Sequence, residues 1–71
     1  MPHPAQIRDA VQVYIEQQYH PVRTWNIQDE ITNRLDTRHT LVYTALRQLE
    51  QEGRICKHVS GRADRWVIMV A

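Results

Sequence analysis

The stretch from Thr37 to Gly53 constrains the fold most, because it carries one strongly helical pattern that ends in a glycine. Four apolar residues recur there at helical spacing and predict a single apolar stripe: Val42, Ala45, Leu46 and Leu49. Gly53 supplies a residue that enters the left-handed conformation at a helix end without steric cost. We therefore predict a helix over residues 38–52 whose stripe faces the core.

The other face of this helix carries polar and amphipathic side chains that can reach phosphates or base edges. They are Arg38, His39, Thr40, Tyr43, Thr44 and Arg47. The two arginines have a second interpretation, as part of an ordinary solvated helix face. The ring of Tyr43 could equally pack on a neighbouring element and leave only its hydroxyl in water.

Two shorter helices are expected before this one. Helical spacing of apolar residues predicts the first over 5–19, after a flexible lead-in at 1–4 and before Pro21, which disfavours helix at the residue preceding it. The segment 22–26 favours an extended conformation and predicts a brief strand at the edge of a small sheet.

The second helix is predicted over 27–35, with Asn26 as its N-cap. Asp36 breaks the apolar pattern and is suited to a turn, because Asp can enter left-handed conformations. Thr37 then offers a cap for the helix that follows. Two helices joined by so short a turn are typical of a helix-turn-helix.

After Gly53 the apolar period changes to two, which predicts a hairpin over 54–70 around a glycine-containing loop. Trp66 falls on the inward face of its second strand, and we expect Trp25 to be half-buried beside it. Cys56 is interpreted as a small strand residue. The chain thus forms a single domain, 1–71, of three helices and a small sheet.

The composition excludes several classes of protein. With 71 residues, 42% of them hydrophobic and 24% charged, the chain is a small globular domain. One cysteine excludes an internal disulfide framework and a cysteine-based zinc site, and the four histidines lack metal-ligand spacing. No catalytic constellation, glycine-rich loop, membrane span or signal peptide is evident. We expect a cytoplasmic non-enzyme without metal or cofactor.

Charge is unevenly distributed along the chain, although the formal net charge is only +1. Residues 1–36 carry three arginines against five acidic residues, which gives −2. Residues 37–71 carry six basic residues against three acidic ones, which gives +3. The basic half contains the helix with the polar face, and this asymmetry indicates a polyanionic partner.

Residues 30–55, EITNRLDTRHTLVYTALRQLEQEGRI, resemble the core of the winged helix-turn-helix superfamily of DNA-binding domains. The matching positions are the apolar pair Ile31 and Leu35, the inward-facing Val42, Leu46 and Leu49, the Glu-rich end before Gly53, Ile55 opening the wing, and Trp66 returning from it. The resemblance implies an α+β fold of three helices with a small antiparallel sheet ending in a wing hairpin.

The resemblance also implies a mechanism. The third helix would lie in the major groove of double-stranded DNA, and the wing would lie along the backbone or the adjacent minor groove. Three basic residues of the wing would contribute there: Lys57, Arg62 and Arg65. The implied function is sequence-specific DNA binding by a small, nucleoid-associated transcriptional regulator. The alternatives are a protein–protein interaction module of a multisubunit complex and a DNA-binding accessory factor of a mobile element.

Apolar residues that lie off the predicted core faces indicate an interface. Val67 and Met69 alternate with the inward residues of the last strand, while Val13 and Tyr19 lie off the stripe of the first helix. Exposed apolar surface of this kind often marks a contact with another chain. We expect a homodimer through the first helix and the last strand, which would match a palindromic site on DNA.

Overall fold

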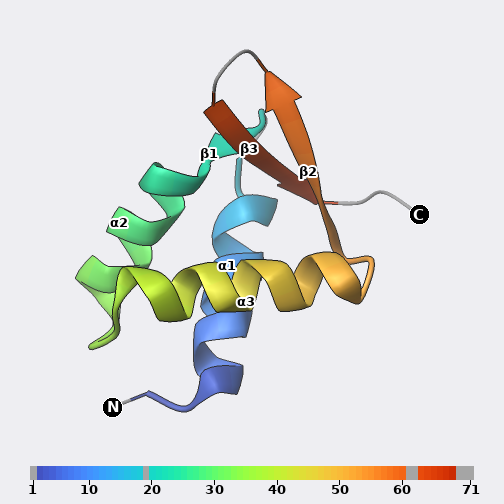
Figure 1. Ribbon diagram of the computed structural model, residues 1–71. Helices are drawn as coiled ribbons and strands as arrows, with labels where there is room; N and C mark the ends of the chain where they lie inside the picture. The colour runs from blue at the N-terminus through green and yellow to red at the C-terminus, as the bar shows by residue number, and fades with distance from the viewer. Residues whose placement is uncertain (1, 19, 61–62, 69–71) are drawn as a thin grey trace.

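A computed structural model describes residues 2–18, 20–60 and 63–68, and after Lys57 it describes the backbone alone. The elements in chain order are α1 (Pro4–Glu16), β1 (Val22–Arg23), α2 (Thr24–Arg34), α3 (His39–Gln51), β2 (Ile55–Ser60) and β3 (Ala63–Ile68). In Figure 1, α3 crosses in front of α1, α2 lies at one end of α3, and the β2–β3 hairpin rises from the other end. The predicted winged-helix architecture is confirmed.

The three strands form one antiparallel sheet in the order β1-β3-β2. β1 aligns Val22 with Trp66 and lies at one edge of the sheet, where the sequence predicts a brief strand. β2 pairs with β3 along its whole length, from Ile55 opposite Ile68 to the end of the hairpin. The short β1 therefore ties the segment between α1 and α2 to the far end of the chain.

The core collects apolar side chains from all three helices and two of the strands. The stripe of α3 is buried as its spacing predicts, with Val42, Leu46 and Leu49 at 0% exposure. The other buried residues are Ala45 of α3, Ile7, Val11 and Ile15 of α1, Ile27 and Ile31 of α2, Val22 of β1 and Ile55 of β2. Every described element except β3, whose side chains lie outside the description, contributes to this core.

The predicted flexible lead-in at 1–4 is wrong for its described part, because a capping box orders the start of α1. The Nδ1 atom of His3 accepts a hydrogen bond from the backbone N–H of Ala5 at 3.2 Å, and the backbone N–H of His3 donates to Oε1 of Gln6 at 2.8 Å. These reciprocal bonds satisfy N–H groups that a helix start leaves unpaired. α1 also ends at Glu16, earlier than the predicted residue 19.

α2 begins at Thr24, three residues before the predicted start, and Arg23 is its N-cap. Asn26, predicted as the cap, therefore lies inside the helix. The physical reason is the pairing of β1 with β3, which holds Val22 and Arg23 in the sheet and lets the chain enter the helix directly after them. The predicted extended segment is correspondingly reduced to these two residues.

The turn between α2 and α3 also differs from the prediction. α3 begins at His39 with Arg38 as its N-cap, so Thr37 is not the capping residue. Instead the hydroxyl of Thr37 is buried and has no hydrogen-bond partner among the described residues. Asp36 does not adopt a left-handed conformation. Among the described residues only Gly53 has a positive φ, at 76°.

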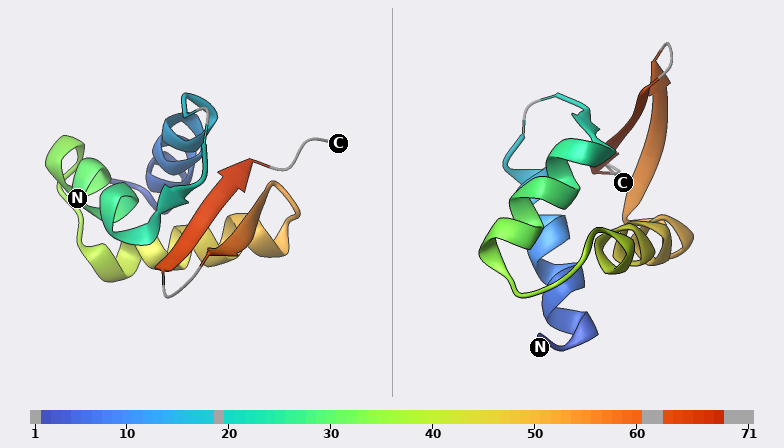
Figure 2. Two further views of the ribbon diagram at one scale, coloured as in Figure 1. Left: turned by 90° about the horizontal axis from the view of Figure 1, so that it is seen from above. Right: turned by 60° about the vertical axis from the view of Figure 1, so that its left-hand side comes forward.

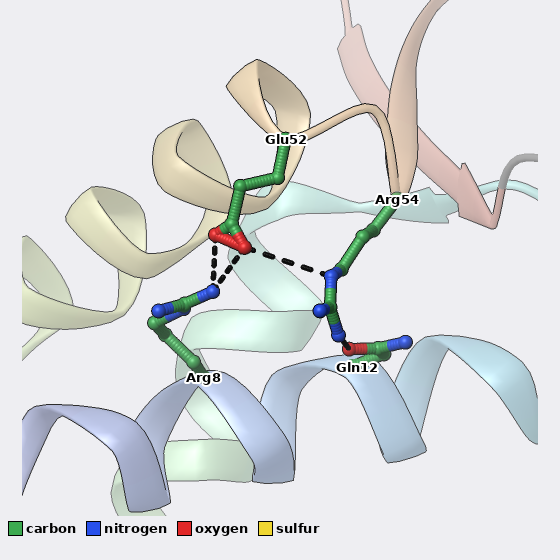
Figure 3. A network of polar contacts seen from close by, with 4 residues as sticks. All are labelled: Arg8, Gln12, Glu52 and Arg54. Atoms are coloured by element: carbon green, nitrogen blue, oxygen red, sulfur yellow. Dashed lines mark hydrogen bonds and ion pairs between the residues drawn. The ribbon is translucent and has the colours of Figure 1, made fainter.

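A polar network joins the end of α3 to α1 (Figure 3). One terminal guanidinium nitrogen of Arg8 contacts both carboxylate oxygens of Glu52. Arg54 places its Nε 3.5 Å from Oε1 of Glu52 and donates from Nη1 to Oε1 of Gln12 at 3.3 Å. The Arg8 and Glu52 side chains are 32% and 36% exposed, so solvent screens the pair and its net stabilisation is at most about 1 kcal/mol. The network therefore connects the end of α3 to α1 with little net stabilisation.

Replacing Leu46 with Ala should lower the free energy of unfolding by ~2–5 kcal/mol, because it leaves a cavity at the centre of the core. Urea denaturation followed by circular dichroism measures the change. Leu41→Ala on the same helix is the matched control, since Leu41 is 38% exposed and should cost far less. Equal effects of the two substitutions would contradict the assigned helical phase.

Candidate nucleic-acid interface

The side of α3 opposite its buried stripe forms an exposed polar face. Thr40, Thr44, Arg47 and Gln51 recur there at helical spacing, and all four are exposed. Figure 1 shows α3 across the front of the molecule with α1 behind it, and the view from above in Figure 2 shows α3 along one edge of the molecule. The hydroxyl of Thr44 donates to the backbone oxygen of Thr40 at 3.0 Å, which leaves its methyl and lone pairs for a ligand. Gln51 carries no distinguishing signal in the sequence, because glutamine is common on helix surfaces.

Arg47 lies in the middle of this face. Its Nε is 3.6 Å from Oε1 of Glu50, and its side chain is 55% exposed. A surface pair at this spacing along a helix contributes only about 0.2–0.5 kcal/mol, so the guanidinium is readily released to another anion. Arg47 can therefore contact a phosphate oxygen or a guanine edge at little cost.

The beginning of α3 is attached to α2 by two contacts. The imidazole of His39 meets the indole of Trp25 edge to face, with ring centroids 5.2 Å apart and planes at 83°. The Nε2 group of Gln28 donates to the backbone oxygen of His39 at 3.1 Å. Arg38, just before, is exposed, and Tyr43, one turn later, is half-buried and packs against the core.

Trp25 differs most from its predicted surroundings. The sequence predicts a half-buried indole, yet Trp25 is 63% exposed. Because α2 already includes Thr24 and Trp25, helix geometry places Trp25 ~200° around the axis from the buried Ile27. The indole consequently points away from the core and toward the start of α3, where it meets His39. No periodic signal in the sequence predicts this contact, because it depends on where α2 begins.

The predicted wing residues are placed only in part. Lys57 is exposed on β2. In the backbone register Arg65 of β3 stands between Arg23 of β1 and His58 of β2, so three residues with basic side chains form one row across the sheet. Arg62 lies outside the described residues. The described candidate residues therefore lie on or beside two adjoining elements, α3 and the sheet.

An apolar groove of about 270 Å³ borders α3 on the side nearest the start of α1. It is lined by Pro2, Pro4, Ile7, Leu41, Thr44, Ala45 and Gln48. Among the described residues no three His, Cys, Asp or Glu side chains are placed to hold a metal ion. Nor does any helix in the described ranges have the length and apolar character needed to cross a membrane.

A helix-turn-helix carried by α2 and α3, backed by α1 and followed by a β2–β3 hairpin, defines a winged helix-turn-helix domain. Residues 6–68 match the family model of the TBPIP/Hop2 winged helix domain, and the chain belongs to this family. A search of curated proteins gives no match.

Two solved structures share the fold. One belongs to a study of the DNA recognition and protein interaction domains of HOP2 and of its homologous DNA pairing properties. It superposes with a TM-score of 0.78 at 21% sequence identity, covering 89% of this chain and 98% of that one. The other is the crystal structure of SSV1 F-93, with a TM-score of 0.72, 16% identity, and coverage of 97% of this chain and 72% of that one. At these identities the likeness concerns the fold.

Proposed function

We propose that this chain binds double-stranded DNA without catalysing a reaction on it, with α3 in the major groove and the β2–β3 hairpin on the backbone or adjacent minor groove. The observation that carries the proposal is the exposed polar face of α3, on a helix whose opposite stripe is fully buried and therefore rigidly held. The DNA recognition named for HOP2, which shares this fold, supports it.

The roles follow from position. The N-terminal half of a helix in the major groove approaches base edges most closely, so Thr40 and Thr44 are suited to a thymine methyl or a phosphate. Arg38 and Arg47 are suited to guanine or phosphate. The remaining proposed contacts are to phosphates, from His39, Tyr43, Lys57, Arg62 and Arg65.

The narrower form of the proposal is a sequence-specific transcriptional regulator acting at the nucleoid in the cytoplasm. Selection of bound duplexes from a random pool tests it directly. Enrichment of one consensus supports regulation at an operator. Duplex binding without any enrichment contradicts sequence specificity and favours an accessory or architectural role, as in a mobile element.

A second candidate function is protein binding, and the apolar groove beside Leu41 is the observation that favours it. The two functions differ in their response to salt. Binding to DNA weakens steeply with salt because cations return to the phosphates, whereas an apolar protein interface changes little. A titration of affinity against salt concentration therefore separates them.

Arg47→Ala should weaken duplex binding by ~1–3 kcal/mol and relax the preference at one base position, because it removes a base-reading cation from α3. Arg38→Ala should weaken binding in the same assay. Arg54→Ala is the matched control: its side chain is also 55% exposed and paired with a Glu, but it is turned toward Gln12 of α1. Fluorescence anisotropy with a labelled duplex measures all three, and equal affinities would show that the face is wrongly assigned.

The proposed homodimer uses α1 and the last strand. Val13 is 46% exposed and lies on α1 away from the buried Ile7 and Val11. Met69 and Tyr19, also predicted at this interface, lie outside the described residues. Sedimentation equilibrium at micromolar concentration should give twice the 8.5 kDa chain mass for the parent and the chain mass for Val13→Lys. Leu41→Lys, in the groove, should remain dimeric. A monomeric parent would contradict the dimer.

A further inference from the structure

Trp25 is the most exposed large apolar side chain in the described part of the protein, at 63%. An indole left in water is costly, and tryptophan is enriched where one end of a side chain is apolar and the other meets a polar partner. The ring lies at the start of α2, beside the first residue of α3. It is therefore next to the face that we propose for DNA, although it is not part of α3.

The ring is held in place before any ligand arrives. The edge-to-face contact with His39 restrains the indole, and the bond from Gln28 to the backbone oxygen of His39 restrains the residue that it contacts. A side chain with little freedom left loses little entropy when a ligand packs on it. Trp25 is thus both exposed and preorganised, which is the combination expected of a binding residue.

The surroundings of the ring are basic. Arg23 is the N-cap of α2 and Arg38 is the N-cap of α3, and both side chains are exposed. Within the described part of the chain neither forms an ion pair or a side-chain hydrogen bond. Asp29 follows Trp25 one turn further along α2, so the basic residues lie at the start of this helix. The patch, defined as Arg23, Trp25, Arg38 and His39, combines one apolar ring with two available cations.

We propose that this patch contacts the sugar–phosphate backbone at the edge of the major groove that α3 enters. The indole face packs on a deoxyribose, its Nε1–H donates to a phosphate oxygen, and Arg23 and Arg38 contact the flanking phosphates. This inference rests on the proposed function. Contacts to the backbone carry no base information, so Trp25 positions α3 in the groove and leaves the reading of sequence to α3 itself.

The test compares the parent protein with Trp25→Ala, Trp25→Phe and Asn33→Ala on one labelled duplex and on a duplex of unrelated sequence. Trp25→Ala should weaken binding to both duplexes by about tenfold, because a well-packed aromatic contact is lost. Trp25→Phe keeps an aromatic ring but loses the indole N–H, and its affinity should fall between those of the parent and Trp25→Ala. Asn33→Ala, also exposed on α2 but outside the patch, should bind like the parent. Thermal melting of each variant should stay close to that of the parent, since the indole is mostly in water.

Acrylamide quenching gives a second readout that does not depend on any loss of affinity. The fluorescence that Trp25→Phe removes from the parent reports on Trp25, and it should be strongly quenched in the free protein and protected when duplex is added. If the parent binds duplex but Trp25→Ala binds with the same affinity, this inference alone is overturned. The same holds if duplex does not protect Trp25 from quenching. A parent that binds neither duplex overturns the proposed function instead. If Trp25→Ala loses affinity for one duplex sequence only, then Trp25 contacts bases, and the proposed backbone contact is overturned.

Discussion

Burial of the α3 stripe against α1 and α2 is the interaction on which the rest of the structure depends. Val42, Leu46 and Leu49 are fully removed from water, and they belong to one core cluster with side chains from every other element whose side chains are described. A chain of 71 residues buries too little surface for a second core, so this contact carries most of the stability. The exposed polar face belongs to the same helix, and its orientation is therefore fixed by the core packing behind it.

The exit from α3 depends on a backbone conformation. The N–H of Gly53 donates to the oxygen of Glu50 and the N–H of Arg54 to that of Leu49, both at 3.0 Å, which is a Schellman motif. Gly53 has a φ of 76°, and an added Cβ would meet nothing within 4 Å, so the backbone conformation and not space requires glycine. The reversal then delivers Ile55 to the core at 1% exposure and starts the wing.

The sequence predicts most reliably what local periodicity controls. The stripe of α3, its end at Gly53 and the order of elements all follow from spacings within a few residues, and the structure confirms them. Contacts between distant residues are not encoded in this way. The start of α2 depends on the pairing of Val22 with Trp66, and the exposure of Trp25 follows from that start. The contact of Trp25 with His39 at the start of α3 could therefore not be found from the sequence pattern.

The weak net charge of the chain is compatible with a polyanionic partner because the charges on α3 are arranged along its length. The carboxylate of Glu52 at the C-terminal end is engaged by Arg8 and Arg54, and that of Glu50 faces Arg47. The N-terminal end begins at the exposed Arg38, where the helix dipole adds a partial positive charge of roughly half a unit. The field thus favours phosphate at the start of α3.

The cations that we propose to contact phosphates are confined to α3, the start of α2 and the wing, and the slope of affinity against salt scales with their number. A strongly basic domain obtains much of its affinity from counterion release, with little dependence on the fit of its surface. If α3 enters DNA as proposed, counterion release is supplemented by contacts that require close fit, from the threonines and arginines of α3 and from packing of an aromatic ring. Such contacts need a rigid helix, and the buried stripe on the opposite side of α3 holds the helix in place.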